Sequence, residues 1–188
     1  PGIWTADDFD PNVAGSFAAM AAEAGELYQI SGDWTWSDAS IPIPSGLYLI
    51  DGNVSISSSG VSGEDVTFVA TGQIAVSSTG LSFTPYVPGL TFMTTLVTPK
   101  DSYAFALSGA GNVGGTVYAP SGRISISGAG NQVTGAFMAR WIDISGSGSR
   151  IYLAPVPVPV SEACGTFDIE AIAGDSIVKA RVTDRGDS

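Results

Sequence analysis

Residues 46–153 repeat one short pattern at intervals of about twenty residues. Each repeat holds a segment in which two apolar residues flank a small or polar one. These segments lie at 54–56, 74–76, 105–107, 124–126 and 142–144. The step from Val54 to Ile74 is 20 residues, that from Phe105 to Ile124 is 19, and that from Ile124 to Ile142 is 18. A fixed period of this length is typical of a solenoid, in which successive turns of the chain stack on one another.

A second series of short apolar segments precedes the first one in every repeat. Its members lie at 47–49, 66–68, 90–92, 117–119 and 137–139. The corners repeat as well, since Ser-Gly-Ala-Gly-Asn at 108–112 recurs at 127–131 and 145–149 is similar. Glycine permits tight corners with a positive φ angle, where a side chain would clash. The gap of 31 residues from Ile74 to Phe105 is too long for one step and too short for two, which predicts an interrupting loop.

The repeats predict a mainly β protein whose residues 46–153 form a short parallel β-helix. We expect about five coils of 18–20 residues each, with an interior of Ile, Val, Leu and Phe. An antiparallel β-sandwich also uses short strands at regular spacing and stays the alternative. The solenoid is favoured because a sandwich does not need corners that recur almost unchanged.

Residues 1–45 are predicted to cap the start of this β-helix. Asp10 is a residue type that often caps the start of a helix, and Pro11 is one often found in its first turn. Gly25 is a residue type that often ends a helix, so we predict an amphipathic helix near 12–24. The segment also carries many aromatic residues, namely Trp4, Phe9, Tyr28, Trp34 and Trp36. We expect these side chains to close an exposed core, and the alternative is that they line a ligand groove.

The C-terminal part is predicted to contain a strut and a β-hairpin. Residues 154–160 alternate proline with apolar residues, which favours an extended polyproline strut. Within 161–188, the segments 166–171 and 176–182 flank a Gly-Asp turn and predict a hairpin followed by a tail. Because two strands alone are marginal in water, we expect the hairpin to pack on the solenoid, on another copy or on a further segment.

Cys164 is the sole cysteine, so no disulfide forms within this sequence. Its functional interpretation is an intermolecular disulfide formed in an oxidising compartment, and its alternative is an idle or buried thiol. The chain begins at Pro1 without an initiator methionine, and we expect it to be a processed or shortened form of a longer protein. It holds no apolar stretch of the 18 or more residues that a membrane span needs, so we expect it to be soluble as given.

Charge and composition exclude several function classes. The 188 residues include no histidine, which removes the histidine general base, the Ser/His/Asp nucleophile system and imidazole metal ligands. A net charge of −11 disfavours binding to nucleic acid or to anionic membranes. We therefore predict no enzyme, no catalytic residue, no cofactor and no metal site. Only 13% of the residues are charged, and the many small residues are typical of exported β-rich surface proteins.

The carboxylates leave alternatives to this prediction. Asp7, Asp8 and Asp10 cluster near the start, and Glu64 and Asp65 are predicted to lie in a turn. A calcium ion bound by the first cluster is one alternative, against a role in local capping. A pair of carboxylates that cleaves polysaccharide is the other, because two such groups suffice for glycoside hydrolysis. The Ser-Gly corners are interpreted as turns and not as phosphate loops, since no Lys-Ser/Thr pair follows them.

Several segments resemble a known family of envelope proteins. The sequences at 46–54, 66–74 and 115–128, together with Cys164-Gly165-Thr166-Phe167-Asp168-Ile169 and 180–182, are similar to the repeat region of TadE/TadG-type proteins related to Tad (Flp) pilus assembly. The resemblance covers roughly residues 26–182. It implies a bacterial envelope protein with an extracytoplasmic part and an N-terminal membrane anchor, which this sequence lacks. It implies no catalytic residue.

These observations together predict a non-enzymatic structural or assembly protein, extracytoplasmic and located at the cell surface. The protein is expected to be a subunit or accessory of a pilus-like filament, or an adhesin, and its partners to be other copies of itself or other envelope and pilus proteins. Open coil ends would bind neighbours by strand addition. The alternative is a β-helix protein that binds or cleaves surface polysaccharide. It would be favoured by Trp34, Trp36 and Trp141 on one exposed strip beside paired carboxylates.

Overall fold

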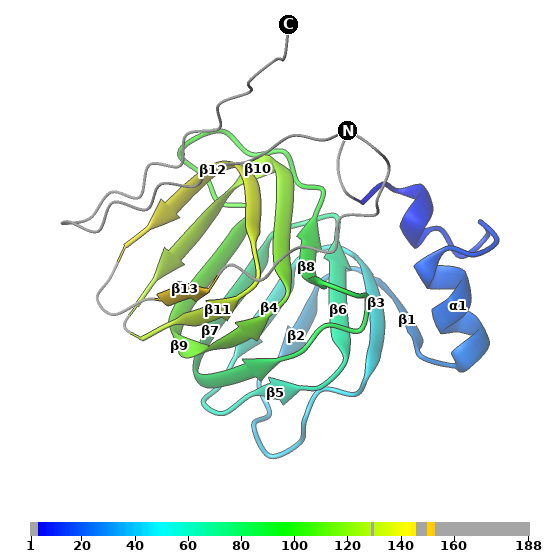
Figure 1. Ribbon diagram of the computed structural model, residues 1–188, viewed down its shortest axis with the longest axis horizontal. Helices are drawn as coiled ribbons and strands as arrows, with labels where there is room; N and C mark the ends of the chain where they lie inside the picture. Colours follow the sequence, from blue (N-terminus) through cyan, green and yellow to red (C-terminus); the bar gives the residue numbers. More distant parts are fainter. Residues whose placement is uncertain (1–3, 129, 146–149, 153–188) are drawn as a thin grey trace, which may run out of the picture. The chain divides into compact units, whose positions relative to one another are not determined.

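The computed structural model describes residues 4–128, 130–145 and 150–152. These residues form a parallel β-solenoid of about six turns with one short helix near the N-terminus (Figure 1). Every pairing between its strands is parallel, apart from an isolated antiparallel bridge between Val87 and Leu90. The predicted fold class, a mainly β protein built as a short parallel β-helix, is confirmed.

Each turn contributes strands to three stacked series. The first series lines one wall of the solenoid and comprises β1 (Leu27–Ser31), β3 (Gly46–Asp51), β6 (Val66–Ala70), β8 (Leu90–Thr94) and the starts of β10 (Thr116–Ser127) and β12 (Phe137–Ile144). The second comprises β2 (Trp34–Trp36), β4 (Val54–Ser57), the starts of β7 (Ile74–Phe83) and β9 (Phe105–Gly114), and the ends of β10 and β12. These two series are the ones that the repeats predicted.

The third series has much shorter strands, and no segment of the sequence predicted its position. Its members are β5 (Ser62–Gly63), the ends of β7 and β9, β11 (Gln132–Thr134) and β13 (Arg150–Tyr152). The number of buried apolar residues here changes from turn to turn: the end of β7 buries Leu81 and Phe83, whereas the end of β9 buries only Val113 and β11 only Val133. No alternation therefore repeats from turn to turn in the sequence, and this is why the series was missed.

The core consists of columns in which like residues stack from turn to turn. In one column Tyr48, Phe68 and Phe92 occupy paired positions of β3, β6 and β8. Their ring centroids lie 4.9 Å and 5.4 Å apart, and the Phe68 and Phe92 rings are nearly parallel, at 11°. Phe68 and Phe92 are fully buried. Burying a side chain of this size stabilises the fold by about 1.5–3 kcal/mol.

The solenoid begins at Leu27 and not at the predicted residue 46. Strand β1 pairs with β3, and β2 pairs with β4, so residues 27–36 form a first coil. Its aromatic residues Tyr28 and Trp34 point along the core columns, where Tyr28 stacks on Tyr48 at 4.4 Å and Trp34 lies 5.5 Å from Tyr48. The predicted cap at 1–45 is therefore too long, because its residues 27–36 belong to the solenoid. This coil was missed because it carries tryptophans where later coils carry Ile and Val.

The helix α1 (Phe17–Ala24) is shorter than the predicted helix at 12–24. Its N-cap is Ser16, whose Oγ accepts a hydrogen bond from the Ala19 amide at 3.0 Å, and not Asp10. Gly15 has a φ of 79°, a left-handed conformation that a helix cannot contain, so the helix starts after it. Gly25, with a φ of 75°, ends the helix as predicted.

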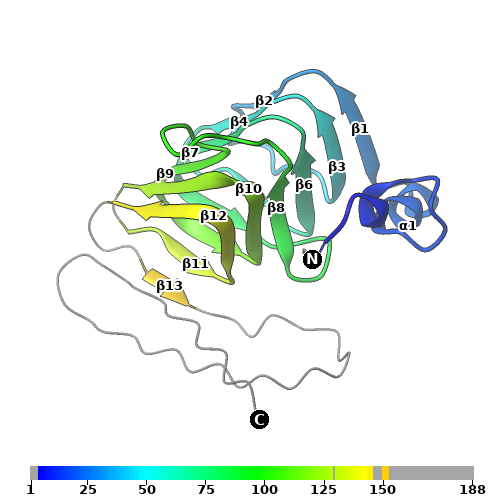
Figure 2. The same ribbon diagram turned by 90° about the horizontal axis from the view of Figure 1, so that it is seen from above.

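The N-terminal segment packs on the outside of the first strand series. A 3-10 turn, η1 (Asp7–Phe9), precedes α1, and both views place α1 next to β1 and β3 (Figures 1 and 2). Ala18 and Ala21 of the helix share a cluster of buried apolar residues with Leu47, an outward-facing residue of β3. Trp4 joins the same cluster, 5.6 Å from the ring of Tyr118. The helix thus covers a side of the solenoid and leaves the inward residues of the first coil half-buried.

The predicted interruption of the repeats is a loop at 95–104, between β8 and β9. Ile74 pairs directly with Phe105, so the gap of 31 residues is a single step with an insertion. The repeated corners adopt the expected positive φ, 115° at Gly109 and 105° at Gly128. The predicted strut at 154–160, the hairpin at 161–188 and Cys164 lie outside the described residues.

Candidate functional site

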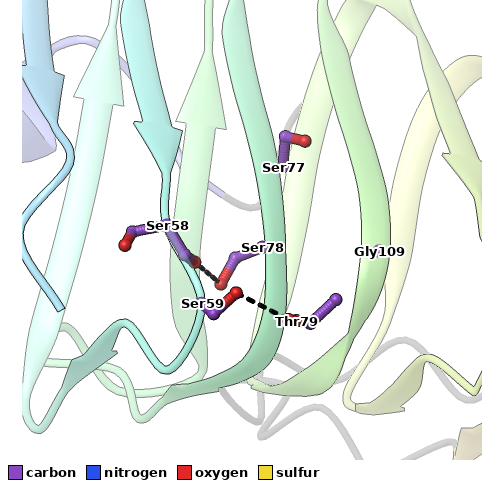
Figure 3. Close-up of a pocket in the computed structure, with 6 residues that line it drawn as sticks. All are labelled: Ser58, Ser59, Ser77, Ser78, Thr79 and Gly109. Carbon is purple, nitrogen blue, oxygen red and sulfur yellow. Dashed lines mark hydrogen bonds between the residues drawn. The ribbon is translucent and has the colours of Figure 1, made fainter.

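A small open depression on the outer surface is lined by hydroxyl groups. Its volume is about 200 Å³, and Figure 3 shows its residues, Ser58, Ser59, Ser77, Ser78, Thr79 and Gly109. The Ser78 hydroxyl donates to the Ser58 carbonyl, and the Thr79 hydroxyl donates to the Ser59 hydroxyl at 2.9 Å. None of the six residues carries a charged or basic group. The serine hydroxyls therefore have no lining group that would take their proton and make them nucleophiles.

A larger groove of about 410 Å³ lies between the N-terminal segment and the first strand series. Phe9 borders it on one side, and Leu49, Val69 and Met93 line its floor. Asp51 is the one carboxylate among the residues that line it, and its Oδ1 accepts a hydrogen bond from Thr71 at 2.9 Å. Glycoside hydrolysis needs two carboxyl groups facing each other across the bond that breaks. The lining of this groove supplies one.

The acidic residues near the N-terminus are bound within their own turns. The Asp8 carboxylate accepts hydrogen bonds from the amide and the hydroxyl of Thr5, at 2.7 Å and 2.8 Å. The Asp10 carboxylate accepts two from Asn12, at 2.8 Å and 2.9 Å. Within the part of the chain that the structure describes, no three His, Cys, Asp or Glu residues gather as metal ligands would. The contacts of Asp8 and Asp10 are therefore those of local turn capping.

The tryptophans proposed as a sugar-binding strip lie at different ends of the solenoid. Trp34 and Trp36 belong to β2 in the first coil and pack against the core. Trp141 belongs to β12 in the last described coil, where the guanidinium of Arg140 lies 4.4 Å from its ring. Because four coils separate these strands in the stack, the three rings form no common strip. The arrangement favours structural roles for them.

The first coil leaves one end of the solenoid open. In the sheet, β1 pairs with β3 and β2 with β4, and neither has a second partner among the described strands. The core-facing residues of this coil are half-buried and large, namely Tyr28, Ile30, Trp34 and Trp36. An unpaired strand edge above an apolar layer is a template for strand addition.

The last described coil leaves the other end open in the same way. Strand β12 pairs only with β10 among the described strands. Ile142 and Ile144 stand in core columns, yet 45% and 40% of their surfaces are exposed. Equivalent residues one coil earlier, Ile124 and Ile126, are buried. The exposure of Ile142 and Ile144 therefore comes from the absence of a next coil in the described structure.

A ladder of polar side chains joins the first three coils at one corner. The Asp33 carboxylate accepts hydrogen bonds from the amide and the side chain of Asn53, at 2.8 Å and 3.0 Å. Asn53 in turn accepts one from the amide of Gln73 at 2.8 Å. The backbone hydrogen bond from Asn53, followed by the side-chain one, lowers the pKa of Asp33 below its usual 3.8. The charged form of Asp33 thus holds the first coil to the second.

This ladder predicts acid-sensitive stability for the first coil. Because the pKa of Asp33 is lowered in the folded protein, its contribution is complete above pH 3.8 and is lost as the pH falls through the lower folded value. In urea unfolding, Asp33→Asn should be less stable than the wild type at pH 7, and the difference should shrink below pH 3.8. Thr35→Ser, a non-titrating control in the same coil, should differ from the wild type equally at both pH values. If the difference in stability between Asp33→Asn and the wild type were the same at both pH values, the charged form of Asp33 would not stabilise the first coil.

Arg123 fastens the inserted loop to the last two coils. Its guanidinium donates to the Asp143 carboxylate at 2.7 Å and to the Lys100 carbonyl at 2.5 Å, and it lies 4.8 Å from the ring of Tyr103. The pair with Asp143 is the only salt bridge among the described residues. Since Lys100 and Tyr103 belong to the loop at 95–104, one side chain links the loop to the solenoid.

Removing this link should open the loop to proteases. We expect Arg123→Ala to raise the rate of tryptic cleavage after Lys100 about tenfold, which corresponds to roughly 1.4 kcal/mol of local stability. Fragments ending at Lys100 would be quantified by mass spectrometry. Arg140→Ala is the control, since it also removes an arginine next to an aromatic ring but no contact with the loop. Equal rates for the two variants would show that Arg123 does not hold the loop.

Comparison with protein-family models, curated proteins and solved structures finds no significant match to this chain. The class of protein is therefore defined by the fold alone: it is a parallel β-solenoid whose described coils end in open strand edges. No helix in the described ranges is long and apolar enough to cross a membrane.

Proposed function

We propose that this chain is a non-enzymatic structural protein of the bacterial cell surface that assembles through the open ends of its solenoid. The observation that carries the proposal is the pair of end coils, whose strand edges have no partner among the described strands and expose core-facing apolar residues such as Trp34 and Ile142. Both features favour binding by strand addition, which buries the apolar layer and pairs the edge.

The lateral surface supports the same function. The two depressions described above lack the paired acid and base that a hydrolase needs. The net charge of −11 keeps free subunits soluble and disfavours nucleic acid as a partner. An extracytoplasmic location is supported by the low content of charged residues and by the resemblance to TadE/TadG-type proteins. Within such a system the chain would be a subunit or accessory of a pilus-like filament, or an adhesin.

The proposal is tested by measuring where the chain is located in its source cells and whether it is assembled there. The experiment is fractionation of the source cells, followed by immunogold electron microscopy of intact cells with an antibody against the chain. We expect the label on the cell surface in regular filaments or patches. A dispersed monomer in the cytosolic fraction would overturn the proposal. Cleavage of surface polysaccharide by the purified chain would overturn its non-enzymatic part and favour the polysaccharide alternative.

A further inference from the structure

The charges of this chain are separated along the solenoid. Residues 1–99 contain 10 Asp or Glu residues and no Lys or Arg. The first coil accordingly carries Asp33 and Asp38 without a basic residue. The last described coil carries Arg140 and Arg150, and its one carboxylate, Asp143, is already paired with Arg123 of the preceding coil. Among the described coils, the first is therefore acidic and the last is basic.

The apolar columns that reach the two ends have matching residues. One column runs from Tyr28 through the coils to Phe137. Two others run from Trp34 to Ile142 and from Trp36 to Ile144. In each of them a half-buried or exposed apolar residue stands at both ends. A second copy placed on the stack would continue all three columns without a polar residue entering the core.

We propose that the partner of the open ends is a second copy of this chain, stacked head to tail. Strand β12 of one copy would pair in parallel with β1 and β2 of the next, so that Ile142 lies against Trp34. In this register Trp141 of one copy lies opposite Asp33 of the next. The guanidinium of Arg140, which lies 4.4 Å from the Trp141 ring, is then the nearest basic group of the last described coil to that carboxylate. This inference rests on the proposed assembly function and specifies its partner. Because the two surfaces differ, the contact does not close on itself and extends into a filament.

Ser37 and Ser145 provide a direct test of this register. Both are exposed, and they follow Trp36 and Ile144 in the chain. The equivalent serines of the inner coils are paired in adjacent strands, Ser57 with Ser77 and Ser108 with Ser127. The Cα atoms of paired strand residues lie within the range that a disulfide spans. Cysteines at 37 and 145 should therefore form a disulfide between copies.

The experiment uses the full chain with Cys164→Ser, which removes its own cysteine. One protein preparation also carries Ser37→Cys, and a second carries Ser145→Cys. Under mild oxidation we expect covalent dimers only when the two are mixed, and a ladder of multimers when both changes are on one chain. Ser82→Cys mixed with Ser145→Cys is the control, because Ser82 is exposed on the side of the solenoid. Asp33→Lys should reduce the yield at least severalfold, and Arg140→Glu on the other copy should restore it.

The outcomes separate this inference from the proposed function. Dimers in either single preparation, or as many dimers in the Ser82→Cys control, would overturn head-to-tail stacking. No dimer in the mixture, with surface assemblies still seen by electron microscopy, would show that the open ends bind another envelope protein and would overturn self-stacking alone. No dimer together with a cytosolic monomer would overturn both proposals.

Discussion

Replacing Phe68 by alanine is expected to lower the free energy of unfolding by about 3–5 kcal/mol. Phe68 is fully buried in the middle of the aromatic column, with Tyr48 on one side at 4.9 Å and Phe92 on the other at 5.4 Å. The truncation removes buried apolar surface and leaves a cavity that its stacked neighbours cannot fill without leaving their columns. Urea unfolding followed by tryptophan fluorescence measures the change.

The matched control for this change is Val97→Ala. Val97 lies in the inserted loop with 71% of its surface exposed, so its truncation should change the free energy of unfolding by less than about 0.5 kcal/mol. A Phe68→Ala effect below about 1 kcal/mol would mean that the core relaxes around the lost ring, and that the column is not a principal source of stability.

Gly109→Ala is expected to destabilise the solenoid by about 3 kcal/mol or more. Gly109 has a φ of 115°, which disfavours any side chain, and a Cβ atom there would overlap the backbone carbonyl of Ser78 in the neighbouring coil. The two coils would have to separate at that corner, at the expense of the hydrogen bonds between them. Thermal and urea unfolding would both report the loss.

Gly60→Ala separates the two causes of that loss. Gly60 also has a positive φ, 79°, but a Cβ atom there would meet nothing within 4 Å. Its replacement should cost only the conformational part, about 1–2 kcal/mol. If Gly109→Ala and Gly60→Ala destabilise equally, the close approach of the coils at Gly109 is not what requires glycine there.

The solenoid could be predicted because both its apolar segments and its glycine corners recur at a period of about twenty residues. Alternation such as 124–126 gave the second strand series, and the recurring glycine corners distinguished stacked coils from a sandwich. The first coil could have been found in the same way, since Trp34 precedes Val54 by one period and Thr35 separates two aromatics as Ser55 separates two aliphatics. Its aromatic residues concealed the equivalence.

The candidate site was predictable in kind but not in detail. Open ends follow from any short stack of coils, so strand addition could be expected from the repeats alone. The corner ladder could not, because Asp33 and Asn53 are different residue types and only the folded geometry lets each accept a hydrogen bond from the backbone amide of the next coil. The true N-cap of α1 was likewise hidden, because the left-handed φ of Gly15 is a property of the fold.

The polar ladder and the stacked strands also determine how the chain responds to tension. Hydrogen bonds between coils run along the axis of the stack, and each coil contacts only its neighbours. A pull that separates the two ends loads these bonds coil by coil, starting from an end. Each released coil of 20 residues, the offset between Asp33 and Asn53, adds roughly 70 Å of extended chain. Such a molecule lengthens in discrete steps, and at the cell surface that we propose for it, it would absorb a sudden load before its attachments fail.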